Sequence, residues 1–315
     1  MYDGTMSDGT MSDFEFPMNL VEAAQSGDDI ALVDRGVAAV TRLMWMDGLP
    51  HVVDDLARRW SLELGPPFQP GGVASWVAPA RTRSGTQVVL KVSWRHDEAL
   101  HEPDGLRAWN GDGAVRLLDS LAAEGTTALL LESCRPGSTL SQMLPPLEQD
   151  VVVTSLLRRL WIEPPSPHPF RPLRSMCDSW ADEYEEKHAA ASQGPQPDPG
   201  LARAGIELFR SLPGTAERSV LLFTDLHPDN VLAATREPWL AIDPKPYVGD
   251  PTYDALQHML NFPDRLAADP TSFVSRMARL LDLDDERLRH WLFARCVQES
   301  INQPHLLDVI IKIAP

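Results

Sequence analysis

The chain has 315 residues, of which 43% are apolar and 23% charged, and its formal net charge is −17. This length allows two modest domains with ample cores, and the composition is typical of a soluble globular protein. The negative charge argues against binding to nucleic acid or to an anionic membrane surface, because both would repel the chain. No apolar run approaches the roughly 18 residues of a membrane-spanning helix.

The three cysteines lie far apart and form no CxxC pair. This spacing argues against a disulfide framework or a zinc ribbon and favours a reducing, cytoplasmic location. Residues 1–17 lack the basic and apolar regions of a secretory signal, and we expect a disordered tail there. The charge itself has two interpretations: a surface that keeps the protein soluble, or a cleft of carboxylates that binds a cationic ligand.

The first part of the chain, residues 18–132, predicts a small lobe of mainly antiparallel strands with one inserted helix. Apolar residues recur at helical spacing at its start, and the period then changes to that of strands. The expected elements are a helix over 28–64, strands over 73–80 and 87–94, a helix over 97–109, and strands over 113–119 and 127–132.

A connector containing Pro136 and Gly137 predicts the boundary to a larger, mainly helical lobe over residues 133–315. Its expected helices cover 139–144, 149–161, 173–191, 200–211, 253–261, 271–281 and 285–313. One β-hairpin, with strands at 231–233 and 239–242, interrupts them. The predicted fold class is therefore α+β, with two lobes.

The residues that most clearly indicate chemistry flank this hairpin. Asp225 and Asn230 precede it with the spacing D-x-x-x-x-N, and Asp243 ends its second strand. In the catalytic loop of kinases, an aspartate at this spacing accepts the proton of the attacking hydroxyl, and the asparagine holds Mg²⁺. We therefore predict Asp225 as a catalytic residue and Asn230 and Asp243 as metal ligands. The alternative is a turn in which Asp225 and Asn230 bond to their own backbone.

Other polar residues are expected to support this loop. His227 is predicted to form a hydrogen bond within it, although a zinc site made of His227, Asp229 and His258 is an alternative. Asp250 can cap the helix that follows the hairpin. Asp254, one turn into that helix, could reach back to the catalytic loop.

A nucleotide site is predicted from Lys91, which lies in a strand-like run and is one of only four lysines. In the small lobe of a kinase, such a lysine binds the phosphates of ATP and pairs with a glutamate of the next helix. Glu98 and Glu102 share one face of that helix, and Glu102 is the preferred partner because it lies deeper in it. The alternative is a half-exposed strand lysine.

The sequence contains neither G-K-[ST] nor G-x-G-x-x-G, which excludes P-loop and Rossmann folds. Any cover for the phosphates would be the loop tip at 72–76, whose backbone N–H groups would bind them. The connector from Glu132 to Cys134 would present backbone groups to the edge of an adenine.

The acceptor of the phosphate is expected to be cationic. Asp178, Asp182 and Glu185 share one face of the helix predicted over 173–191, and Glu299 on the last helix could join them. Several carboxylates in one cleft would attract a polyamine-like cation. The alternative is an acidic face in contact with water.

Together these motifs resemble the aminoglycoside phosphotransferase family, which has the protein-kinase-like fold. The closer similarity is to its streptomycin 6-phosphotransferase and hydroxyurea-resistance kinase branch. The similarity covers residues from about 19 to the C-terminus, and its main carriers are Val89-Leu-Lys-Val92, Thr224-Asp-Leu-His-Pro-Asp-Asn-Val-Leu232, Ile242-Asp-Pro-Lys-Pro246 and Gly249-Asp-Pro-Thr-Tyr-Asp254.

The resemblance implies transfer of the γ-phosphate of ATP, with Mg²⁺, to a hydroxyl of a cationic aminoglycoside-type antibiotic, which confers resistance. We also expect a monomer or homodimer with no nucleic-acid or membrane partner. A kinase of an endogenous sugar or metabolite, or a nucleotide-binding protein without transfer activity, are the alternatives. In one departure, Phe223 stands where the family usually has a histidine. That histidine generally serves packing, so we expect catalysis to survive.

Overall fold

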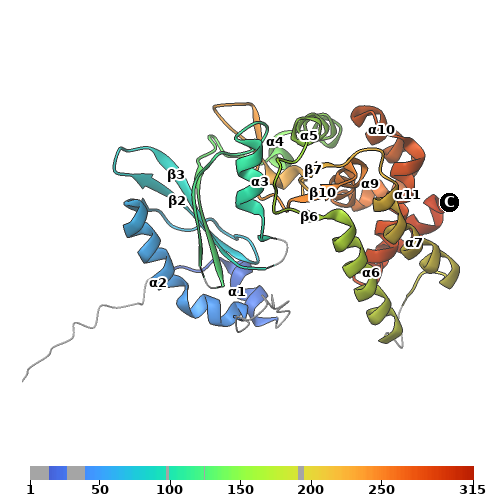
Figure 1. Cartoon of the computed structure of the whole chain (residues 1–315), viewed down its shortest axis with the longest axis horizontal. Coiled ribbons are helices and arrows are strands. Elements are labelled where there is room, and N and C mark those ends of the chain that lie inside the picture. The colour runs from blue at the N-terminus through green and yellow to red at the C-terminus, as the bar shows by residue number, and fades with distance from the viewer. Residues whose placement is uncertain (1–13, 27–39, 97–98, 124, 191–194) are drawn as a thin grey trace, which may run out of the picture. The chain divides into compact units, whose positions relative to one another are not determined.

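The computed structural model describes residues 14–26, 40–96, 99–123, 125–190 and 195–315. The chain folds into two compact units, whose elements are labelled in Figure 1. Unit 1 comprises residues 1–100 and 117–133, and unit 2 comprises residues 101–116 and 134–315. Over the described ranges, no helix is both long and apolar enough to cross a membrane.

Unit 1 is built around a five-stranded antiparallel sheet in the order β1-β2-β3-β5-β4. The strands are β1 (Leu62–Leu64), β2 (Ser75–Thr82), β3 (Gln87–Trp94), β4 (Leu117–Ala123) and β5 (Thr126–Glu132). Helices α1 (Met18–Gln25) and α2 (Arg42–Trp60) pack on one face of this sheet (Figure 1). Leu90, Val92 and Trp94 of β3 point into the resulting core, because alternate residues of a strand face the same side.

The first helix differs from the prediction over residues 28–64. Residues 27–39 lie outside the described part, α2 ends at Trp60, and Leu62–Leu64 form β1. Ser61 ends the helix in a left-handed conformation with φ 51°, and the chain then pairs with β2. The helical prediction is therefore wrong for residues 62–64. Helix α1 is not predicted from the sequence.

Unit 2 is mainly helical. Its helices are α3 (Glu102–Trp109), α4 (Leu140–Met143), α5 (Pro146–Leu160), α6 (Leu173–Ala190), α7 (Pro199–Ser211), α8 (Ala255–Leu260), α9 (Pro263–Ala268), α10 (Pro270–Leu281), α11 (Asp285–Glu299) and α12 (Leu307–Ile313). One small sheet joins β6 (Arg171–Pro172), β10 (Tyr247–Gly249) and β7 (Val220–Leu222), and a hairpin joins β8 (Val231–Ala233) and β9 (Trp239–Ala241). The α+β architecture predicted from the sequence is confirmed.

Helix α3 belongs to unit 2 by its contacts, although it lies in the 18–132 range assigned to the small lobe from the sequence. The indole N–H of Trp109 donates to the carbonyl of Leu160 at 2.8 Å. Gly105 lies so close to Pro246 that a Cβ at this position would stand 2.5 Å from the proline Cγ. The helix is therefore fixed against the segment that follows the hairpin.

Two further elements are shorter than predicted. The strand expected over 113–119 begins only at Leu117, and Ala114 forms an isolated bridge with Ala241 instead. The helix expected over 285–313 stops at Glu299 and resumes as α12, after a short 3-10 helix that starts at Pro304. Proline has no N–H to continue a helical ladder, which explains the break.

A buried carboxylate, Asp150 of α5, ties four helices of unit 2 together. It accepts hydrogen bonds from His258 of α8 at 2.8 Å, from two nitrogens of Arg265 of α9 at 2.8 Å each, and from Arg276 of α10 at 2.6 Å. Burial raises the pKa of Asp150, but these partners outweigh burial and hold the pKa well below its usual range. Asp150 is therefore a charged anchor of the helical packing.

Candidate active site

The predicted catalytic loop follows β7 and is held by the carboxylate of Asp254. The backbone N–H groups of Phe223 and Thr224 donate to it at 2.9 and 2.6 Å. The indole N–H of Trp161 is a third donor, at 2.9 Å. Thr224 has a left-handed backbone with φ 56°, a conformation that a residue with a side chain adopts only at a cost. Asp254 therefore stabilises the turn directly before Asp225.

Phe223 occupies the position where the sequence departs from the family pattern. Its side chain is fully buried and its ring packs against that of Trp109, with centroids 5.5 Å apart. Phe223 thus serves packing between the loop and α3.

Asp225 lies beside Lys245, whose Nζ is 3.3 Å from Oδ2 of the aspartate. Burial raises the pKa of Asp225, the neighbouring Lys245 and His227 lower it, and the nearby Asp243 raises it. Together these effects raise the pKa of Asp225 above its usual value. A carboxylate with a raised pKa is a stronger proton acceptor, which suits a general base.

Asn230 and Asp243 lie at the same end of the β8–β9 hairpin as Asp225. The side-chain nitrogen of Asn230 donates to the backbone carbonyl of Asp225 at 3.0 Å, so the carboxamide oxygen is the atom that could bind a cation. The N–H of Ile242 donates to the carbonyl of Asn230 at 2.9 Å, and Asp243 follows directly, exposed and with φ 60°. The structure thus brings together two carboxylates and an amide oxygen, a donor set that suits Mg²⁺.

The zinc alternative finds no support in unit 2. His258 is bonded to Asp150, and Asp229 accepts a hydrogen bond from the hydroxyl of Ser141. No group of three His, Cys, Asp or Glu side chains that could hold a metal occurs among the described residues. The Nδ1 atom of His227 is buried and has no hydrogen-bond partner within the described structure. His227 contributes instead through its backbone carbonyl, which accepts from the N–H of Asn230 at 2.9 Å.

Asp250 caps the short 3-10 helix η4 (Pro251–Asp254) by accepting from the N–H of Thr252 at 3.0 Å. Its other oxygen accepts from Arg287 at 2.6 Å and from the indole of Trp291 at 2.6 Å, both in α11. Asp250 therefore connects the helix that carries Asp254 to the core of unit 2.

The residues predicted to bind the nucleotide are divided between the units. Lys91 lies in the central strand β3 of unit 1, is 7% exposed, and stands between Val77 and Leu129 of the neighbouring strands. Glu102 is the buried first residue of α3 in unit 2, and Glu98 lies outside the described residues. Glu132 ends β5 of unit 1, and Cys134 is partly exposed at the start of the main part of unit 2.

The carboxylates predicted to bind a cationic acceptor are all paired with arginines. Arg210 of α7 contacts Asp182 at 2.7 Å and Glu185 at 2.9 Å. Asp178 is 3.7 Å from the guanidinium of Arg174, and Glu299 is 2.5 Å from that of Arg295. A cationic ligand at this face would therefore have to replace an internal cation.

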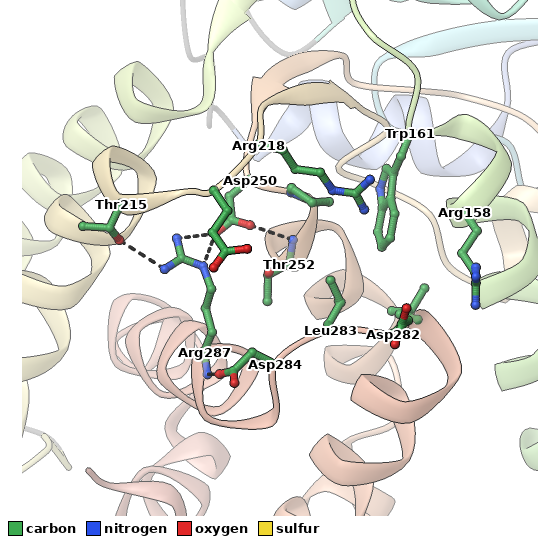
Figure 2. A pocket seen from close by; sticks show the side chains of 13 residues that line it. Arg158, Trp161, Thr215, Arg218, Asp250, Thr252, Asp282, Leu283, Asp284 and Arg287 are labelled. Atoms are coloured by element: carbon green, nitrogen blue, oxygen red, sulfur yellow. Dashed lines mark hydrogen bonds and ion pairs between the residues drawn. The ribbon is translucent and has the colours of Figure 1, made fainter.

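Unit 2 also contains a pocket of about 790 Å³, shown in Figure 2. Arg218 lies over the ring of Trp161, with its guanidinium carbon 5.6 Å from the ring centroid, and Arg287 joins Asp250 and Thr215 on the other side (Figure 2). Asp250 is the sole predicted site residue that lines it.

Trp161 links this pocket to the catalytic loop, since it lines the pocket and also donates to Asp254. Sequence reasoning missed this tryptophan. The two partners stand 93 positions apart, and no local spacing relates them.

Comparisons with known proteins identify the family. Residues 59–303 match the family model described as aminoglycoside/hydroxyurea antibiotic resistance kinase. Streptomycin 6-kinase of Streptomyces griseus is 35% identical over 281 residues, which cover 86% of this chain and 87% of that protein. Hydroxyurea phosphotransferase of Kitasatospora aureofaciens is 34% identical over 264 residues, which cover 82% and 74%.

Solved structures show the same fold. A thermostable mutant of aminoglycoside phosphotransferase APH(4)-Ia has a TM-score of 0.53 at 17% identity, covering 82% of this chain and 95% of that one. Aminoglycoside phosphotransferase APH(3'')-Id from Streptomyces rimosus has a TM-score of 0.50 at 18% identity, covering 83% and 98%. The predicted protein-kinase-like fold is thereby confirmed. The chain belongs to the aminoglycoside/hydroxyurea antibiotic resistance kinase family and is a phosphotransferase with an alcohol group as acceptor.

Proposed function

We propose that this protein uses ATP and Mg²⁺ to phosphorylate a hydroxyl of a cationic, aminoglycoside-type antibiotic and thereby inactivates it. The observation that carries the proposal is the grouping of Asp225, Asn230 and Asp243 at one end of the β8–β9 hairpin. The names of the relatives support it, since two of them are streptomycin 6-kinases. The S. rimosus enzyme has also been solved with ADP and streptomycin.

Each predicted residue has a role in this proposal. Asp225 orients the acceptor hydroxyl and takes its proton as the oxygen bonds to the γ-phosphorus and the bond from that phosphorus to ADP breaks. Lys245, 3.3 Å from Asp225, favours the ionised form that can accept this proton. Asn230 and Asp243 would hold Mg²⁺, which when bound neutralises charge on the phosphates.

The roles predicted from the sequence for the nucleotide-binding residues are kept in this proposal. Lys91 would bind the phosphates of ATP with Glu102 as its predicted partner, and Glu132 and Cys134 would present backbone groups to the base. Positioning and charge neutralisation supply most of the acceleration in such a reaction. The cytoplasmic location and the monomeric or homodimeric state stay predictions.

The acceptor would be bound by Asp178, Asp182, Glu185 and Glu299. Because each of them is already paired with an arginine, binding would exchange one cation for another. The same pairing favours a second candidate acceptor, hydroxyurea, which is neutral. The hydroxyurea phosphotransferase is 34% identical to this chain, close to the 35% of the streptomycin enzyme.

The test measures ATP consumption with streptomycin and with hydroxyurea for the wild type and Asp225→Ala. Losing the general base is expected to lower kcat by about 10²–10⁴, or about 3–5 kcal/mol of barrier. Asp229→Ala is the matched control, since this exposed aspartate lies in the same loop and bonds only to Ser141 within the described structure. Undiminished turnover in Asp225→Ala would remove Asp225 from the mechanism.

A further inference from the structure

Residues 14–19 of unit 1, here called the strap, run along the loop that connects β1 and β2. Asn19 binds this loop twice: its backbone N–H donates to the carbonyl of Pro70 at 3.0 Å, and its Nδ2 donates to the carbonyl of Gly71 at 2.8 Å. Gln69 of the loop completes the connection. Its side chain accepts from the N–H of Met18 at 3.1 Å and donates to the carboxylate of Glu15 at 3.0 Å.

The strap and the loop also pack closely. Gly71 has φ 76°, and a Cβ at this position would stand 2.4 Å from the Cβ of Pro17. Only glycine allows both this conformation and this approach. The strap is thus fitted to the turn at Gly71.

Aromatic contacts anchor the other end of the strap to the sheet. The rings of Phe14 and Trp76 are stacked with centroids 5.5 Å apart and an interplanar angle of 25°. The indole N–H of Trp76, which is 3% exposed in β2, donates to the carbonyl of Glu15 at 3.0 Å. Residues 14–17 are therefore part of the fold of unit 1, although the sequence placed them in a disordered tail.

The loop needs such support because of its own composition. It continues the β1–β2 pair, with the N–H of Phe68 donating to the carbonyl of Val77 at 2.8 Å, and then turns through Gly71 and Gly72. Adjacent glycines lose more conformational freedom on ordering than other residues do. The strap bonds to the carbonyls of Pro70 and Gly71 and so orders the turn from one side. The N–H groups that follow the turn are then held in place.

We infer that the strap orders the β1–β2 loop for nucleotide binding and that Asn19 is a positioning residue for the phosphates of ATP. The inference rests on the proposed function and on the prediction from the sequence that backbone N–H groups of residues 72–76 bind those phosphates. Asn19 acts through the carbonyls of Pro70 and Gly71 and does not touch the nucleotide. A loop that is ordered before binding loses less entropy when the ligand arrives, which raises affinity.

The test compares Asn19→Ala with the wild type in the full chain. The substitution removes the bond to Gly71 and keeps the backbone bond to Pro70. We expect the Kd for ADP and the KM for ATP to rise roughly three- to tenfold, the effect of losing one hydrogen bond. At saturating ATP, the kcat and the KM for the acceptor should change less than about twofold, because the bound nucleotide then holds the loop in its ordered form.

Asn261→Ala is the matched control. Asn261 also makes one side-chain bond to a backbone carbonyl, that of Gln257 at 2.9 Å, but at an exposed position of unit 2. It should leave the Kd for ADP unchanged. Gln69→Ala, which removes the contacts to Met18 and Glu15, should weaken ADP binding as Asn19→Ala does.

Amide hydrogen exchange of residues 71–75 is the second readout. Faster exchange in Asn19→Ala together with an unchanged Kd for ADP would overturn the inference, since the loop would be loosened without effect on the nucleotide. A wild type that binds ADP but phosphorylates no acceptor would contradict the proposed function and leave this comparison intact. A wild type that binds no ADP would overturn both.

Discussion

Asp254 is a buried carboxylate on which the shape of the catalytic loop depends. Burial raises the pKa of Asp254 to about 6, while the bonds from Phe223, Trp161 and Thr224 lower it. An unfolded aspartate titrates near 3.9, so between about pH 4 and 6 the folded chain holds a proton that the unfolded chain has lost. The contribution of Asp254 to the free energy of unfolding therefore falls as the pH rises through that window. The charged form, present above about pH 6, is the better acceptor for the two loop N–H groups.

We expect the catalytic loop to lose its geometry when Asp254 becomes protonated, so kcat should fall below about pH 6. Trp161→Phe removes one donor, which raises the pKa of Asp254 further. The acid limb of the kcat profile should then move to higher pH by about 0.5–1 unit, the equivalent of one hydrogen bond. A pH series of the coupled ATP assay measures this shift.

Trp60→Phe is the matched control for Trp161→Phe. Its indole N–H also donates to a carboxylate, that of Asp119 at 2.8 Å, but at an exposed site of unit 1. An equal shift in both variants, or none in either, would contradict the coupling of Trp161 to the loop.

Single residues differ in how far the sequence predicts them. Asp225, Asn230 and Asp243 are predictable because a short loop and a hairpin fix their spacing, and the structure places them together. Trp161 is not, because its partner is distant in the chain. The arginines that neutralise the acidic face are equally hidden, since Arg210 lies on a different helix from Asp182 and Glu185. Helical spacing predicted the acidic face but not the arginines that pair with it.

At the scale of elements, α3 makes a close contact with the segment that follows Asp243. Besides its clash with Pro246, a Cβ at residue 105 would stand 2.8 Å from the ring of Trp109. Neither neighbour is a flexible chain end. The two segments are held at a distance that only glycine permits.

Gly105→Ala is therefore expected to lower the free energy of unfolding by about 1–3 kcal/mol through overpacking, and to lower kcat because Pro246 lies three residues after Asp243. Gly48→Ala in α2 is the control, because nothing lies within 4 Å of the added Cβ. It should stabilise the protein by about 0.5–1 kcal/mol. Urea unfolding measures the change in the free energy of unfolding for both variants. A change in the same direction in both would contradict the close packing at Gly105.

Element predictions succeeded where a long alternation or a turn between two strands marked the element. β3 has eight residues of strand-like sequence, and the three-residue strands β8 and β9 are joined by a short turn; both predictions are confirmed. β1, β6 and β10 have only two or three residues each, and they pair with strands that no short turn joins to them in the way that β8 is joined to β9. Such segments have no period of their own, so a helical pattern was wrongly extended into β1.

At the scale of the whole molecule, the net charge of −17 is partly compensated at the acidic face that is proposed to bind the acceptor. Arg210 pairs with both Asp182 and Glu185 and cancels one of their two charges, and both carboxylates remain partly accessible, with side chains 66% and 58% exposed. An internal arginine at this face would compete with any cationic acceptor. Removing it would free two carboxylates at once.

Arg210→Ala is accordingly expected to lower the KM for streptomycin several-fold at low ionic strength and to leave the KM for hydroxyurea unchanged. The gain should shrink as salt is added, because added ions screen exposed charges. Arg58→Ala is the control, since Arg58 pairs with exposed Asp54 and Asp55 in unit 1. A KM for streptomycin that does not fall would remove this acidic face from the acceptor site.

The assignment of residues 101–116 to unit 2 affects the order in which the protein can form. On the ribosome, unit 1 is interrupted after residue 100 and can be completed only when residue 133 has emerged. In that interval α3 has been made without its partners, since Leu160, Phe223 and Pro246 are synthesised later. Trp109 lacks Phe223, against whose ring it packs, for more than a hundred further residues of synthesis. A fragment cut after residue 133 would carry α3 without these three partners and would leave the other fragment without α3.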